Sequence, residues 1–156
     1  MKQLKLQELI EQAKLIQPEE WVELERLIEQ SSFAQRSFCD CSWETIPEQI
    51  KYLLITHLKI SKTQLNNLPE SIGKLSNLID LDLSQNQLTN LPESMESLSN
   101  LSYLNLSQNR FTSLPKSINN LSICVNLSQN QLTSLPENAK IAKAADWPPL
   151  KRVDKK

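Results

Sequence analysis

The chain has 156 residues and a formal net charge of −1, with 17 Lys and Arg against 18 Asp and Glu. This balance gives no electrostatic case for binding nucleic acid or an anionic membrane surface. No apolar run approaches the length needed for membrane insertion, and the odd number of cysteines, 3, favours a reduced, cytoplasmic compartment.

Residues 2–31 favour two amphipathic helices. Each half places its apolar residues on one helical stripe: Leu6, Leu9, Ile10, Ala13 and Ile16, then Trp21, Leu24, Leu27 and Ile28. Pro18 followed by two glutamates is a typical helix start. Charges interrupt the first twelve residues, unlike a signal peptide. The helices are expected either to cap the segment that follows or to mediate dimerisation or docking, since Leu4, Leu15 and Val22 lie off the stripes.

Residues 32–42 show no period and are interpreted as a connector, so residues 1–42 are predicted to be a helical cap and connector. Cys39 and Cys41 flank one aspartate, but a zinc site usually needs four ligands. The single histidine is His57, and the third cysteine, Cys124, is distant in sequence. We therefore expect no metal site and no cofactor.

Three later stretches are nearly identical. They are LIDLDLSQNQLTNLPESMESLSN from Leu78, LSYLNLSQNRFTSLPKSINNLS from Leu101 and VNLSQNQLTSLPEN from Val125. Residues 55–77 follow the same pattern with Thr63 at the position of Asn86, and residues 43–54 keep its second half. The spacing is 23 residues, except that two are missing before Val125. The repeats thus cover residues 43–137, as about four units plus a leading half-unit.

Each recurring position has a physical role. Leu78, Leu81 and Leu83 alternate as in a short strand with one buried face. The asparagine after the strand, Asn86 and its equivalents, can satisfy buried backbone groups of adjacent units. The proline of each LP pair, such as Pro92, suits the first turn of a short helix. Stacked units of this kind present surfaces rather than pockets, which favours a binding function.

The pattern L-x-x-L-x-L-x-x-N-x-L-x-x-L-P-x-x-I-x-x-L resembles the 23-residue class of leucine-rich repeats, which includes plant intracellular Ras-group-related proteins and many bacterial proteins. This resemblance covers about three fifths of the chain. It implies an α/β solenoid with a short parallel sheet on the concave side, short helices or turns on the convex side and a protein-binding role. The missing residues before Val125 put Ser122 where a core leucine is expected, which predicts a shortened convex segment and a local change in curvature.

Residues 138–156 break the repeat and are predicted to form a C-terminal cap and basic tail. Trp147 offers a large apolar cap for the last unit. The lysines and arginine that follow it are interpreted as a solvated terminus.

The open strand positions on the concave face define a candidate partner-binding surface. The first column consists of His57, Asp80, Tyr103 and Cys124, and the second of Lys59, Asp82, Asn105 and Asn126. These residues vary between units, whereas the next outward positions mostly recur, Lys62 being an exception. The predicted partner-binding residues are His57, Lys59, Lys62, Asp80, Asp82, Tyr103, Asn105 and Asn126, with Tyr103 as the anchor. The alternative is a solvated sheet face without a partner.

An enzymatic function is not indicated. Asp80 and Asp82 are neighbouring carboxylates, but they lie on an open sheet that does not exclude water. The only glycine is Gly73, so no glycine-rich phosphate loop exists. We predict no catalytic residues and a non-catalytic module for protein–protein interaction, as a monomer or weak dimer with an unidentified protein partner. The alternatives are a bacterial effector, secreted into a host cell without a cleaved signal, and a structural spacer that oligomerises through its N-terminal helices.

Overall fold

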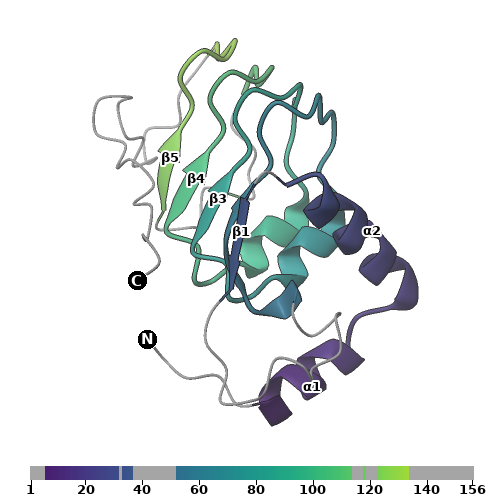
Figure 1. The fold of residues 1–156 in the computed structure, drawn as a ribbon. Helices are drawn as coiled ribbons and strands as arrows, with labels where there is room; N and C mark the ends of the chain where they lie inside the picture. Colours follow the sequence, from purple (N-terminus) through teal and green to yellow (C-terminus); the bar gives the residue numbers. More distant parts are fainter. Residues whose placement is uncertain (1–5, 32, 37–51, 114–117, 119–122, 134–156) are drawn as a thin grey trace, which may run out of the picture.

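The computed structural model describes residues 6–31, 33–36, 52–113, 118 and 123–133. They form a five-stranded sheet in the order β1-β2-β3-β4-β5. The strands are β1 Phe33–Arg36, β2 Ile55–Lys59, β3 Asp80–Asp82, β4 Tyr103–Asn105 and β5 Cys124–Asn126. Strands β2 to β5 run parallel, and short helical turns form a second layer behind them (Figure 1). The expected α/β leucine-rich repeat architecture is therefore confirmed.

The strand register agrees with the alignment of the repeats in the sequence. Leu58 lies opposite Leu81, Leu81 opposite Leu104, and Leu104 opposite Val125. The last of these pairs is in register even though the connecting segment is two residues shorter. Each strand thus begins a unit in which the apolar side chains of one unit stack on those of the next.

Among the described residues, the helical layer includes two 3-10 helices, η2 Glu70–Lys74 and η3 Glu93–Ser97. Pro69 and Pro92 immediately precede them with ψ of 151° and 153°, so each proline ends an extended segment rather than lying in the first turn as expected. Glu70 also joins consecutive units, because its carboxylate accepts a hydrogen bond of 3.0 Å from the backbone N–H of Ser94. This bond lowers the pKa of Glu70.

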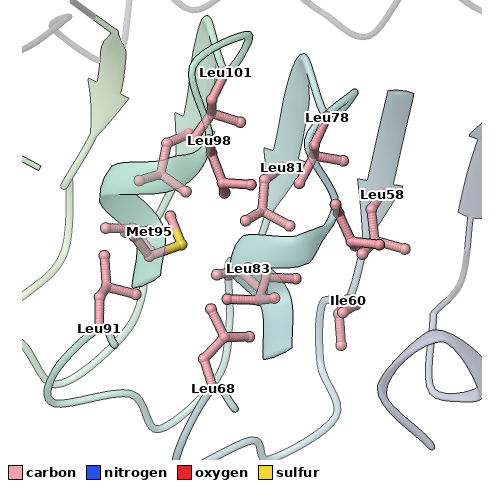
Figure 2. Packing of buried hydrophobic residues seen from close by; sticks show 14 of the residues in the cluster. Leu58, Ile60, Leu68, Leu78, Leu81, Leu83, Leu91, Met95, Leu98 and Leu101 are labelled. Atoms are coloured by element: carbon pink, nitrogen blue, oxygen red, sulfur yellow. The ribbon is translucent and has the colours of Figure 1, made fainter. Parts of the chain in front are cut away.

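The core lies between the sheet and the helical layer. Figure 2 shows Leu58 of β2, Leu81 of β3 and Leu83, which follows β3, in the same apolar cluster as Met95 of η3 and Leu98, which follows η3. Leu58 is 2% exposed and the other four are completely buried. Burying one such side chain contributes roughly 1.5–3 kcal/mol of transfer free energy. The stability of each unit therefore depends on the leucines of its neighbours.

Two α-helices precede the sheet, α1 Leu6–Lys14 and α2 Pro18–Glu29. Leu24 and Leu27 of α2 are buried in the same core as the repeats, and Trp21 and Ile28 pack against it. Polar contacts join α2 to the first full repeat and to the half-unit before it. Glu20 forms an ion pair with Lys74 at 3.4 Å, Glu23 accepts a hydrogen bond from Ser71, and Glu25 accepts one from Tyr52 of the half-unit. Helix α2 thus follows the predicted stripe and packs onto the repeats.

The interpretation of residues 32–42 as a connector was wrong for part of this segment. Residues 33–36 form strand β1, which pairs antiparallel with β2 and places Ala34 opposite Leu58. The first parallel strand would otherwise expose a row of unpaired backbone groups. This pairing is made by backbone groups, so it does not require a particular pattern of side chains. A strand of only four residues therefore shows little hydrophobic periodicity in the sequence. Residues 37–42, with Cys39 and Cys41, lie outside the described residues.

The shortened repeat is described only in part. Ser122 and most of the predicted shortened convex segment lie outside the described residues, as do residues 138–156. Ile123 is buried in the core at 4% exposure, whereas the residues at its register position in the two preceding units, Ile79 and Ser102, are exposed. An apolar residue directly after Ser122 thus supplies core volume in this unit.

Candidate binding surface

Buried asparagines hold the units together at one end of the strands. The side-chain Nδ2 of Asn109 donates to Leu83 O at 2.9 Å in the preceding unit and to Leu106 O at 3.0 Å in its own. Its Oδ1 accepts the N–H of Leu88 at 3.0 Å. One amide group therefore satisfies backbone donors and acceptors from two units, as the sequence predicted.

The same arrangement recurs at Asn86 and Asn130. Asn86 donates to Ile60 O at 2.7 Å, and Asn130 donates to Leu106 O at 2.9 Å. In the first full unit Thr63 replaces the asparagine, and its N–H and hydroxyl both donate to Asn86 Oδ1. We call the three asparagines the asparagine ladder.

The residue before each ladder asparagine, and the residue before Thr63, adopt a left-handed backbone conformation. Lys62, Gln85, Gln108 and Gln129 have φ of 62°, 58°, 56° and 57°. This column therefore makes the turn that leads into the ladder. Lys62, one of the predicted partner-binding residues, belongs to this column and is exposed.

The second column of the open face is largely part of the fold. Asp82, Asn105 and Asn126 each accept a hydrogen bond at their side-chain Oδ1 from the backbone N–H two residues later, at 3.0, 3.1 and 3.0 Å. Asp82 also forms an ion pair with Lys59 at 3.4 Å and is only 6% exposed. This role was not predicted from the sequence, although a recurring Asp or Asn two residues before Ser indicates such a local cap.

The first column has no comparable recurring role. His57, Asp80, Tyr103 and Cys124 are consecutive partners in the strand register. Tyr103 is 36% exposed, and the other three are partly buried. His57 contacts the hydroxyl of Thr56 through Nδ1 at 3.0 Å. The structure thus places these four chemically different side chains in one row across the sheet.

Asp80 lies in the middle of this row. Loss of solvation raises the pKa of its carboxyl above the ordinary value, and the charge of Asp82 acts in the same direction, while His57 and Lys59 oppose the shift. Within the part of the chain that the structure describes, no hydrogen bond or ion pair reaches the Asp80 carboxylate. The carboxyl group of Asp80 is therefore partly shielded from solvent and has no direct polar partner among the described residues.

The described residues bring together no group of three or more His, Cys, Asp or Glu side chains that could hold a metal ion. Cys124 carries a free thiol. None of the helices in the described ranges is long and apolar enough to cross a bilayer. The first column of the open face carries groups for hydrogen bonding and charge pairing, an aromatic ring and a thiol.

A comparison with known protein families agrees with this architecture. A family model described as a leucine-rich repeat region matches residues 39–144. The chain therefore belongs to the leucine-rich repeat proteins, a family whose repeats generally serve as modules for protein interaction. Assignment to the 23-residue class within the family stays a prediction.

Among solved structures, the chain is similar to a leucine-rich repeat protein of Leptospira interrogans, with 28% sequence identity and a TM-score of 0.49. The match covers 74% of this chain and 35% of the other, so the chain spans about a third of that protein's length. No curated protein matches the chain.

Proposed function

We propose that this chain is a non-catalytic module that binds a protein partner through the open face of its sheet. The observation that carries the proposal is the contrast between the two columns. The second column repeats one local hydrogen bond in three units, whereas the first column presents His57, Asp80, Tyr103 and Cys124 in equivalent positions. A repeat keeps what its packing requires, so differing outward positions are where a partner can be recognised.

The structure refines the set of residues to test. Replacing Asp82 would remove a buried cap as well as a candidate contact, so a loss of binding could not be separated from a loss of structure. The test variant therefore combines His57→Ala, Asp80→Ala and Tyr103→Ala. The control combines Glu93→Ala, Glu96→Ala and Ser97→Ala, three exposed residues in η3 of the helical layer.

The experiment is affinity capture from bacterial and eukaryotic lysates, read by mass spectrometry, with both variants checked for folding by circular dichroism. A partner retained by wild type and control but lost by the first-column variant would support the proposal. A partner retained by all three proteins would move the function away from the open face. The lysate that supplies the partner also decides between a cytoplasmic adaptor, which we propose, and a secreted bacterial effector.

Oligomerisation through the N-terminal helices is the second candidate. It is supported by Leu15 and Val22, which are 73% and 64% exposed. Leu15→Ser with Val22→Ser leaves the buried Leu24 and Leu27 unchanged. If sedimentation analysis shows that the wild type is a dimer and that this variant is a monomer, the result would favour a structural spacer that oligomerises through its N-terminal helices. A monomeric wild type would rule out this function.

A further inference from the structure

We infer that the open face recognises an arginine side chain of its protein partner, with the guanidinium paired to Asp80 and lying against the ring of Tyr103. This inference rests on the proposed function and names the chemistry of the group that is bound.

Of the two carboxylates in β3, only that of Asp82 forms an ion pair with a residue of β2 among the described residues. Lys59 and Asp82, in the second column, form an ion pair with each other at 3.4 Å. Asp82 also accepts the N–H of Ser84, so both of its oxygens have contacts within the sheet. Asp80 in the first column has neither kind of contact among the described residues. A cation from outside is therefore complementary to Asp80, since Lys59 is already paired with Asp82, and His57, opposite Asp80 in β2, attracts the carboxylate without a direct contact.

The register places an aromatic ring beside this carboxylate. Asp80 is paired with Tyr103 in the neighbouring strand, and adjacent strands lie about 4.8 Å apart. Tyr103 is 36% exposed. A cation that reaches Asp80 from the open side is therefore within range of the ring, and a cation–π contact adds to the charge pairing when the cation lies over the face of the ring.

Arginine fits this pair of groups better than lysine. Its planar guanidinium can form two hydrogen bonds with a carboxylate and stack on an aromatic ring at the same time. It is also less strongly hydrated than an ammonium group, which matters because Asp80 is partly buried. Binding of a cation favours the ionised carboxylate, so it must lower the pKa that loss of solvation has raised.

The test uses acetylated, amidated Ser-Arg-Ser as the probe and the same peptide with citrulline, which keeps the shape but lacks the charge. Each is titrated into the full chain and followed by the backbone amide shifts of Asp80 and Tyr103 in NMR spectra. We expect saturable shifts at both residues with the arginine peptide and binding about fivefold weaker with citrulline, the factor supplied by one partly exposed ion pair. The pKa of Asp80, read from its carboxyl carbon, should fall when the arginine peptide binds.

Two variants complete the test. Asp80→Asn should abolish the difference between the peptides, whereas Glu93→Gln, on the opposite side of the molecule, should preserve it. Equal binding of the two peptides to wild type, absence of shifts at Asp80 and Tyr103, or an unchanged pKa of Asp80 would each overturn the inference. The proposed function would survive those results if the first-column variant still lost a captured partner, so the two failures are distinguishable.

Discussion

The asparagine ladder and the first column of the open face belong to the same repeats, but the residue type is constant in the ladder and differs from unit to unit in the first column. Asn86, Asn109 and Asn130 are identical, and each bonds to backbone groups of two units. The first column changes from histidine to aspartate, tyrosine and cysteine at equivalent strand positions. Constant positions thus carry the bonds between units, and the variable row is where we propose that a partner is recognised.

The most damaging test of this comparison is Asn109→Asp. The substitution keeps the size of the side chain but removes the donors that reach Leu83 O and Leu106 O, and it places a negative charge beside these carbonyl oxygens. We expect the free energy of unfolding to fall by about 3 kcal/mol or more, measured by urea denaturation. The exposed Asn90→Asp is the matched control and should change stability little. Equal losses in the two variants would contradict a structural role for the ladder.

Gly73 tests the comparison in another way, because its position varies between units and yet the packing of η2 against η3 depends on it. A Cβ atom at residue 73 would lie 2.5 Å from the carbonyl oxygen and 2.7 Å from the Cβ of Ser94 in the next unit. Gly73→Ala should therefore force η2 and η3 apart and cost about 2 kcal/mol of unfolding free energy. Glu96→Ala, at the equivalent position one unit later, is the control because Glu96 is exposed. A thermal melt of Gly73→Ala that matched the control would show that the helical layer shifts without cost.

Asp82 tests whether the second column belongs with the ladder or with the first column. Asp82→Ala removes both the acceptor for Ser84 N–H and the partner of Lys59, and should cost about 1 kcal/mol. Asp82→Asn restores the arrangement found at Asn105 and Asn126 and should recover most of that loss. Chemical denaturation of both variants measures the difference. If the asparagine variant were as unstable as the alanine variant, the ion pair rather than the cap would be the stabilising contact.

The sequence alone was sufficient to predict the repeat architecture, but it was insufficient to predict several details of the strands and of the candidate site. The strand register, the core leucines and the asparagine ladder could be predicted from the periodicity of the sequence. Equivalent positions pack in the same way in every unit and therefore keep the same residue types. Strand β1 was not foreseen, since backbone pairing along the edge of β2 makes it and few side chains mark it. The predicted binding set also mixed two kinds of residue. Asp82 and Asn126 face the open side but are nearly buried by local contacts, which composition and spacing do not reveal.

The smallest expected effect has the opposite sign and occurs at Asp80. Its pKa in the folded protein is raised by loss of solvation, so the ionised form is less favourable in the folded than in the unfolded chain. Its stabilising contribution is present below the unfolded pKa and is lost as the pH rises through the folded value. Asp80→Asn should therefore unfold at a slightly higher temperature than wild type at pH 7, and the gap should close as the pH falls below about 4, the ordinary pKa of aspartate. Glu93→Gln, which removes one exposed charge from the helical layer, controls for the change in net charge. A lower melting temperature for Asp80→Asn at pH 7 would mean that the carboxylate stabilises the fold, and Asp80 would then belong with the ladder rather than with a surface kept open for a partner.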